Sequence, residues 1–500
     1  MAAKLLPFLT ATPLAGAFFV CLLGRRFRSF PPLIGVLVPG ALLGVSLFIW
    51  RAVLKTGPVY HFIGGWKPPY GIPMVCDGLS VFMLITVYGV ASCIALYAVS
   101  YMQKYTALWK FYALFLLILT GLSGVLLSGD LFDLFVYLEL TSLSACTLVA
   151  FGTERQELEA AFKYGVMNTI GGLFILFGIA FLYGYASTLN MADLAGVLAA
   201  KGAGNKVVPL VSVLFLVGFG LKAAIVPFHA WLPDAHPSAP APISAMLSGL
   251  IIKCSGIYAL FRIFCCVLGP QPHVMSALLF LGALSIGVGS FLAIGQTDFK
   301  RLLAYSSLTQ VGTIVLGISL GTPLGILGGL YHLFNHAVFK SLLFLNSGAL
   351  EYATGTRDIE ALGGMSKKMP TTTATNLIAS MSISGIPPFN GFWSKLIIII
   401  AAVQARRYGY AVVVVVGSLL TLASFAKVMR YAFQGSLKEK WSAVKEVPIP
   451  MQSAMVLLAL VCVAGGLLLL PSLKAAFITP AVQVLLNGVA YAKVFGGILG

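Results

Sequence analysis

About fourteen apolar segments of roughly 20 residues follow one another along the chain, and this succession constrains the fold most strongly. Each segment is long enough to cross the hydrocarbon core of a bilayer as an α-helix. Only 9% of the 500 residues are charged, against about 25% in soluble domains. The sequence therefore predicts an all-α polytopic membrane protein, with spans centred near residues 4–23, 32–51, 78–99, 110–128, 131–151, 161–185, 207–229, 241–267, 275–295, 302–320, 324–349, 371–404, 410–433 and 452–471.

Basic residues predict the orientation of these spans. The first segment is too long for a signal peptide, and its arginine cluster follows the apolar run, so we interpret it as a first span. If the N-terminus is outside, most loop lysines and arginines fall inside, and the positive-inside rule then places both termini outside. The net charge of +17 is scattered among loops, which indicates topology signals and lipid headgroup contacts and excludes a nucleic-acid partner. The outer loop 61–76 is rich in Gly, Pro and aromatic residues, which predicts an ordered turn or hairpin.

The cysteines give no sign of a redox or metal centre. The eight cysteines form no CxxC pair and no Cys/His spacing typical of a metal site. We therefore expect no metal and no cofactor. The sequence also shows no redox or hydrolytic site, which leaves open whether the chain is part of an enzyme.

Lys222 lies near the middle of the apolar segment 207–228, which Pro227 interrupts. A lysine there costs about 2.5–3.5 kcal/mol on insertion scales, which suggests that it has a function. The proline removes a backbone donor and frees a carbonyl, which protein or water must satisfy. His229 follows Lys222 by seven residues, nearly two helical turns, and is expected on the same face. A charged, broken span indicates an ion or proton path.

Glu139 lies deep in the predicted span 131–151. A carboxylate at that depth is expected to be paired or protonated, because desolvation disfavours its charged form. It can act as a proton site or as a counter-charge that tunes a lysine, and a purely structural ion pair is the alternative. Asp130 and Asp133 begin the same span, where they are expected to cap the helix.

Lys253 and Lys395 follow the same reasoning as Lys222. A lysine held between a dry environment and a nearby charge can gain and lose a proton near neutral pH. For Lys253 the alternative is an amino group that reaches outward from a helix end. Lys395 follows a predicted helix break at Pro387 and Pro388.

His332, His336 and Lys340 are spaced by four and form one row, about 12 Å long, on one helix face. Two histidines at this spacing can bind a metal, but no third ligand is apparent nearby. A hydrated proton relay is the favoured interpretation, and structural hydrogen bonding is the alternative. His229 is expected to join this path, whereas His236 is expected to be a loop residue.

The two predicted helix breaks are a weak sign of an internal repeat. They lie five spans apart, and an odd repeat length inverts the second copy in the membrane. We therefore predict an N-terminal three-helix segment (1–109), two five-helix repeats (110–267 and 275–433), and a C-terminal helix and tail (434–500).

Seven motifs together carry a resemblance to a known family, in the expected order and over most of the chain. They are GGWKPPYGI (64–72), DLFDLFVYLEL (130–140), AAFKY (160–164), LKAAIVPFHAWLPDAHPSAPAPISA (221–245), TDFKRLLAYSSLTQVG (297–312), HLFNHAVFKSLLFLNSG (332–348) and GIPPFNGFWSK (385–395). The set resembles the antiporter-like subunits shared by Mrp-type sodium/proton antiporters, energy-converting membrane hydrogenases and complex I.

The resemblance implies fourteen transmembrane helices, two inverted five-helix repeats, breaks in helices 7 and 12, and a hydrated charged axis in the membrane midplane. Residues that match the family's axis by motif are Glu139, Lys222, Lys253, His332, His336 and Lys395. One complex I subunit type has glutamate at the position that corresponds to Lys395. The largest complex I type has a long C-terminal lateral helix, which is not expected in this chain. The 64–72 loop looks most like that of the Mrp D type.

These observations predict a proton-translocating subunit of Mrp D type in a multisubunit cation/proton antiporter of a prokaryotic cytoplasmic membrane. Expected partners are homologous antiporter-like subunits, small helical subunits, lipids and protons, while transport of sodium stays open. The first alternative is an ion-pumping subunit of an energy-converting hydrogenase or a complex I-like NADH/ferredoxin:quinone oxidoreductase. The second is a stand-alone secondary solute carrier.

Overall fold

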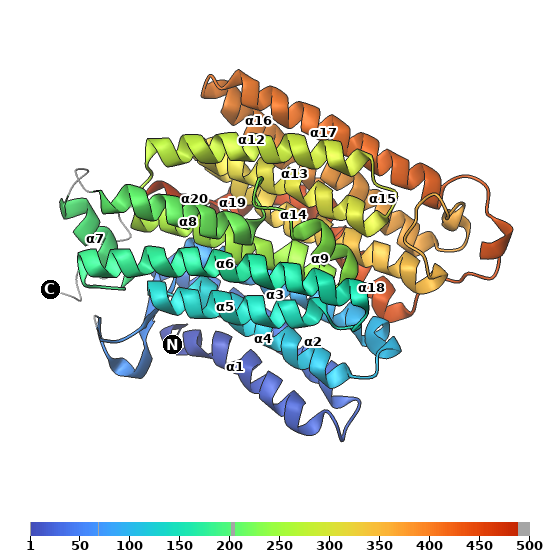
Figure 1. Ribbon diagram of the computed structural model, residues 1–500, viewed down its shortest axis with the longest axis horizontal. Helices are drawn as coiled ribbons and strands as arrows, with labels where there is room; N and C mark the ends of the chain where they lie inside the picture. The colour runs from blue at the N-terminus through green and yellow to red at the C-terminus, as the bar shows by residue number, and fades with distance from the viewer. Residues whose placement is uncertain (1, 69, 202–205, 489–500) are drawn as a thin grey trace.

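A bundle of long helices that run roughly along one common direction forms the body of the protein (Figure 1). The computed structural model describes residues 2–68, 70–201 and 206–488. Within these residues, 11 helices are long and apolar enough to cross a membrane. The all-α membrane architecture is thus confirmed. The number fourteen stays a prediction, because the three helices α8, α15 and α16 that adjoin the breaks have only 17, 15 and 15 residues.

The N-terminal part contributes four of the long helices and a hairpin. The helices are α1 (Ala2–Leu23), α2 (Phe30–Thr56), α3 (Gly78–Tyr101) and α4 (Leu108–Leu127). Strands β1 (Val59–Phe62) and β2 (Pro73–Cys76) pair antiparallel, with Val59 opposite Cys76. This pairing confirms the hairpin predicted for the outer loop. The Asp77 side chain caps α3 by accepting from the backbone N–H groups of Leu79 and Ser80.

The next part of the chain holds the first break. Its elements are α5 (Leu131–Val149), α6 (Arg155–Ala186), α7 (Met191–Lys201), α8 (Val207–Ala223), α9 (Leu232–Ser238), α10 (Ala241–Met246), the π-helix η3 (Leu247–Tyr258), α11 (Ala259–Phe261) and the π-helix η4 (Arg262–Val267). Asp130 accepts hydrogen bonds from the backbone N–H groups of Phe132 and Asp133, so the predicted cap of α5 is confirmed for this aspartate.

The C-terminal half holds the second break, between α15 and α16. Its helices are α12 (Pro272–Ile294), α13 (Phe299–Ser319), α14 (Pro323–Thr354), α15 (Pro370–Ser384), α16 (Asn390–Gln404), α17 (Tyr408–Val428), α18 (Ile449–Ala464), α19 (Pro471–Phe477) and α20 (Thr479–Leu486). The tail packs on the bundle, because the Trp50 indole donates to the Ala476 carbonyl and Ile478 and Ala481 are buried.

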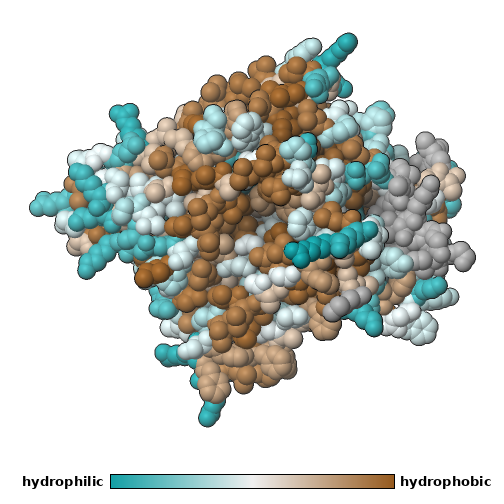
Figure 2. Space-filling model, turned by 180° about the vertical axis from the view of Figure 1, so that it is seen from behind, coloured by the Kyte–Doolittle hydropathy of each residue, from teal (hydrophilic) through white to brown (hydrophobic). Residues whose placement is uncertain are grey.

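Burial separates the helices into an inner and an outer set. The most apolar window of the α10–η4 span is entirely buried, whereas the corresponding windows of α1, α6 and α17 are 39% buried. Apolar side chains dominate the middle of the face seen in Figure 2, and hydrophilic side chains gather at its margins. Large apolar side chains on the outer helices, such as Phe162 and Phe291, are exposed, as expected for surfaces that contact lipid or other subunits.

Candidate functional site

Lys222 forms an ion pair inside the bundle. Its amino group lies 3.1 Å from Glu139 Oε1 and donates to Ser142 Oγ at 3.0 Å. The lysine side chain is 1% exposed and the glutamate side chain 25% exposed. The expected pairing of these two residues is present. The glutamate side chain is thus partly exposed, while the lysine side chain is buried.

The break after Lys222 is held by protein groups. Helix α8 ends at Ala223, and Ala224 adopts a left-handed conformation. The Trp231 indole donates to the Leu221 carbonyl at 2.9 Å, and Ser285 Oγ accepts from the Val226 N–H at 3.0 Å. The backbone groups near Pro227 are therefore satisfied within the membrane, as irregular backbone there requires.

His229 does not lie on the helix face predicted for it. The expectation assumed that one helix continues from Lys222 to His229, but α8 ends at Ala223 and the segment that follows forms turns. His229 is half-buried, and its Nδ1 lies 3.3 Å from the Pro227 carbonyl oxygen. The helical break, which places His229 beside the exposed Pro227, explains the error.

Lys253 lies on η3 in the most buried part of the bundle. Its side chain is 1% exposed, and its amino group donates to the Ser248 carbonyl of the same helix. An amino group that reaches outward is therefore excluded. Two glycines bring neighbouring helices close to η3: a Cβ at Gly256 would collide with the backbone of Ala223, and one at Gly249 would collide with Ser341. Lys253 thus lies between the residue that follows Lys222 and the α14 segment that holds Lys340.

The predicted row of three polar residues on α14 is fully buried. His332 Nδ1 lies 2.9 Å from Ser394 Oγ, and its Nε2 lies 3.1 Å from Gln310 Oε1. The His332 and His336 rings are nearly parallel, with centroids 6.4 Å apart. Lys340 donates to Ser306 Oγ at 2.5 Å.

His336 has no hydrogen-bond partner for either ring nitrogen among the residues that the structure describes. Within the described part of the chain, no hydrogen bond therefore fixes the orientation of the His336 ring. Among the described residues no group of three His, Cys, Asp or Glu is placed to hold a metal ion.

Lys395 occupies the far end of the row, on α16 just after the second break. Its amino group donates to the Ile383 carbonyl at 2.7 Å, and the residue is 4% exposed. The preceding residue, Ser394, bonds His332. Gly385 has a φ of 80°, and a Cβ there would lie 3.0 Å from Lys395 Cδ. Glycine therefore permits both the left-handed turn and the close approach of the lysine stem.

The residues of the row come from several neighbouring helices of the bundle. Figure 1 shows α5, α6 and α8 in succession on one side and α12, α16 and α17 on the other, with α13 and α14 between them. Glu139 on α5 and Lys222 on α8 lie on the first side, and Lys395 on α16 lies on the other. Glu139 pairs with Lys222, and the His332 and His336 rings are neighbours. Lys340 and Lys395 bond Ser306 and the Ile383 carbonyl, Lys253 lies on a closely packed helix, and His229 lies apart.

Two comparisons decide the family. The model of the family described as "NADH:quinone oxidoreductase/Mrp antiporter, TM" matches residues 128–421, and that of "NADH-Ubiquinone oxidoreductase (complex I), chain 5 N-terminus" matches residues 70–112. The chain is 34% identical over 438 residues to the D-type subunit of the Na(+)/H(+) antiporter of Alkalihalophilus pseudofirmus, with 87% of this chain and 86% of the relative covered. The chain belongs to this family of antiporter-like membrane subunits.

Other antiporter-like subunits are also similar to the chain. The N-type subunit of the NADH-quinone oxidoreductase of Desulforudis audaxviator is 39% identical over 407 residues, with 80% of each chain covered. A chain in the structure of the Mrp complex from Dietzia sp. DQ12-45-1b matches with a TM-score of 0.91 and 27% identity, over 98% of this chain and 99% of that chain. These relatives and structures are subunits of larger membrane assemblies, so this antiporter-like subunit has other membrane subunits as partners.

His236 is a buried polar residue that was not expected from the sequence. We expected a loop residue, but its side chain is fully buried on α9, and neither ring nitrogen has a hydrogen-bond partner among the described residues. Its ring centroid lies 5.5 Å from that of Phe344, one turn beyond Lys340 on α14. The proline-rich sequence around His236 suggested an exposed turn, whereas α9 folds back into the bundle after the break.

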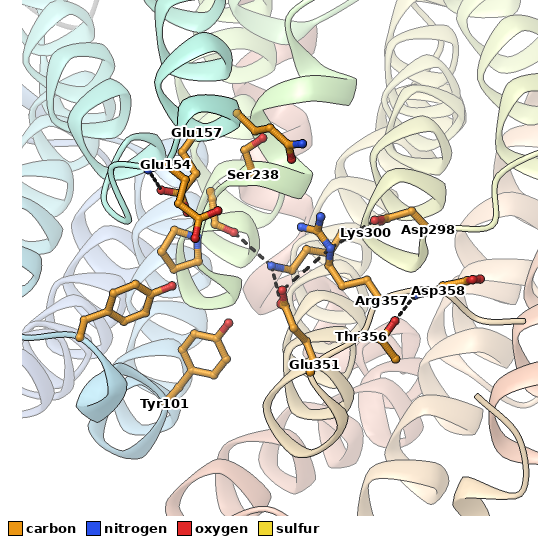
Figure 3. A pocket seen from close by; sticks show the side chains of 15 residues that line it. Tyr101, Glu154, Glu157, Ser238, Asp298, Lys300, Glu351, Thr356, Arg357 and Asp358 are labelled. Atoms are coloured by element: carbon orange, nitrogen blue, oxygen red, sulfur yellow. Dashed lines mark hydrogen bonds and ion pairs between the residues drawn. The ribbon is translucent and has the colours of Figure 1, made fainter. Parts of the chain in front are cut away.

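A polar pocket opens at the end of the bundle next to α9 (Figure 3). Its cavity volume is about 480 Å³. Lys300 lies 2.8 Å from Glu351 Oε2 and donates to the Ala239 carbonyl at 3.1 Å. Arg357 donates to the Pro237 carbonyl at 2.5 Å. Lys300 and Arg357 therefore donate to the backbone carbonyls of Ala239 and Pro237, which closely follow His236 in the sequence.

Tyr105, in the loop before α4, also lines this pocket. Burial, together with the carboxylates of Glu157 and Glu351, raises the pKa of Tyr105. Its hydroxyl therefore stays protonated at physiological pH and available to donate. The wall of the pocket combines this donor with several carboxylates and two cations, a composition suited to hydrated protons or cations.

Proposed function

We propose that this subunit translocates protons within a multisubunit cation/proton antiporter complex, through the buried row that runs from Glu139 to Lys395. The observation that carries the proposal is the burial of these polar side chains on neighbouring helices. Titratable or hydroxyl side chains follow one another on α5, α8, η3, α14 and α16, deep in an otherwise apolar bundle. Such buried charges are costly in a membrane, and proton relays are a common reason for them.

In the proposed mechanism, the charge of each titratable residue in the row changes the proton affinity of the next titratable residue. Glu139 stabilises the charged form of Lys222, so a change in the charge of Glu139 releases or captures the Lys222 proton. Lys253 exchanges protons with the Lys340 and His336 side chains, and His332 passes them through Ser394 toward Lys395.

The polar pocket next to α9 is the proposed aqueous end of this path. The support is the position of His236, which is buried next to the carbonyl groups that Lys300 and Arg357 bind. Its ring nitrogens have no hydrogen-bond partner among the described residues. The pocket lies at the end of the bundle for which the distribution of basic residues predicts the inner side of the membrane. With this orientation both chain termini face the outside of a prokaryotic cytoplasmic membrane.

Replacing Glu139 tests the first step. Glu139→Gln keeps a hydrogen-bond acceptor for Lys222 but removes the charge, and a charge-assisted bond exceeds a neutral one by about 1–2 kcal/mol. We therefore expect proton translocation to fall about tenfold. Proton uptake by proteoliposomes that contain the intact complex gives the rate.

The matched control is Glu159→Gln, which neutralises an exposed carboxylate that pairs with Lys163 on the surface. It should leave the rate unchanged. Equal rates for Glu139→Gln and the unaltered complex, with both assembled to the same extent, would contradict the proposed role of Glu139.

A second candidate function is ion pumping in a redox-driven complex. The 39% identity to the N-type subunit of an NADH-quinone oxidoreductase favours it. The row of buried residues could move protons in either an antiporter complex or a redox-driven complex, because in both proposals neighbouring subunits supply the driving force. Mass spectrometry of the purified native complex separates the two: redox subunits support this second candidate, and an assembly of antiporter subunits alone supports the first.

A further inference from the structure

A second pocket shares Tyr105 with the polar pocket next to α9, and its charged lining residues are all cations. It lies where the end of α1 meets the start of α4, and its cavity volume is about 630 Å³. Among its eleven lining residues there is no carboxylate, and its four cations are Arg25, Arg28, Lys104 and Lys110. All four side chains are exposed, and none forms an ion pair with a carboxylate within the described ranges.

The start of α4 adds further positive potential to this basic pocket. Leu108 and Trp109, the first residues of α4, line it. No side chain caps this 20-residue helix, and its first turn contains no acidic residue. The partial positive charge of a helix N-terminus therefore faces the same space as the four cations.

Trp109 contacts two of the four cations of the basic pocket. The Arg25 guanidinium carbon lies 4.7 Å from the centroid of the Trp109 ring, and Lys110 Nζ lies 5.7 Å from it. A Cβ at Gly24 would lie 2.8 Å from Trp109 Cβ, so the end of α1 packs directly on this tryptophan. Contact with an aromatic face orients the cations but does not neutralise their charge.

Exposed apolar side chains adjoin the pocket. Leu22 and Phe27, on either side of the Gly24 turn, are 58% and 54% exposed. Leu22 lies in the last turn of α1, which is long and apolar enough to span the membrane, and Phe27 follows the end of that helix. A site with unpaired cations beside such a surface matches a molecule with an anionic head and apolar chains.

We propose that this basic pocket binds the phosphodiester headgroup of an anionic phospholipid. The four cations and the N-terminus of α4 contact the phosphate oxygens, and the acyl chains lie along the exposed apolar side chains at the end of α1. The bound lipid would tie α1 to α4 at the membrane surface. This inference does not depend on proton translocation.

Photo-crosslinking of the intact complex tests the site. A photoactivatable phosphatidylglycerol in phosphatidylethanolamine nanodiscs should label peptides that contain residues 22–28 or 103–110. Unlabelled phosphatidylglycerol should compete, whereas phosphatidylcholine and inorganic phosphate should not. Each cation near a membrane surface contributes about 1 kcal/mol, so the triple variant Arg25→Gln/Arg28→Gln/Lys110→Gln should reduce labelling at least about tenfold.

Two further variants distinguish the loss of positive charge in the pocket from a general effect of the substitutions on the protein. Lys367→Gln/Lys440→Gln/Lys445→Gln removes three exposed lysines outside the pocket and should leave labelling intact. Arg25→Lys/Arg28→Lys keeps the charge and should retain most of it. Undiminished labelling in the pocket variant, an equal loss in the outside variant, or competition by phosphatidylcholine or inorganic phosphate as strong as by phosphatidylglycerol would overturn the proposal.

Discussion

Proton translocation by the intact complex should fall to the level of passive leak when Lys222 is replaced by alanine. The substitution removes the amino group that bonds both Glu139 and Ser142, in a position that is 1% exposed. It leaves the glutamate without its cation and interrupts the row between α5 and η3. Loss of a positioned proton-transfer group commonly costs a factor of about a hundred or more.

Assembly should survive this substitution, because Glu139 is 25% exposed and can be solvated or protonated once its partner is lost. Blue-native electrophoresis of the membrane extract checks that the complex is intact. Lys206→Ala, at the exposed start of the same helix, is the matched control and should pump normally. Unaltered pumping by Lys222→Ala would remove this lysine from the mechanism.

Replacing Arg262 with methionine should strongly destabilise the protein. Arg262 Nη1 lies 2.5 Å from Asp77 Oδ2, and Nη2 lies 2.8 Å from Oδ1, in a pair whose side chains are 4% and 3% exposed. Breaking a buried pair by removing one partner costs about 3–5 kcal/mol, because the other charge stays buried. The loss of folded complex on heating, followed by size-exclusion chromatography, measures the effect.

The double variant Asp77→Asn/Arg262→Met should recover much of this loss. Asparagine keeps the cap of α3 but leaves no buried charge behind. Arg407→Met, at the exposed turn before α17, serves as the control and should change the thermal midpoint little. A midpoint for Arg262→Met equal to that of the control would show that the buried pair contributes little.

The sequence predicted the elements whose signal is local. Spans, caps and breaks depend on nearby apolar residues, aspartates and prolines, and the helix breaks near Pro227 and Pro387 lie where they were expected. The row of His332, His336 and Lys340 was also predictable, because a spacing of four on one helix fixes a shared face. Their burial confirms that face as internal.

The errors arose where the path depends on how the chain turns. His229 and His236 both follow the first break, and helical spacing no longer applies there. As a result, the histidine expected on the path lies half-buried, and the one expected in a loop is fully buried. The pairing of Lys300 with Glu351, between the start of α13 and the end of α14, depends on tertiary contact across about fifty residues and has no local signal.

If protons pass along one continuous buried row, removing the middle of that row should stop them. Lys253→Met replaces the amino group on η3 with an apolar side chain of similar length and leaves the Glu139–Lys222 pair and Lys395 in place. The decisive measurement is the proton translocation rate of this variant in proteoliposomes that contain the assembled complex. We expect a rate no higher than the passive leak, and a rate equal to that of the unaltered complex would contradict the continuous row.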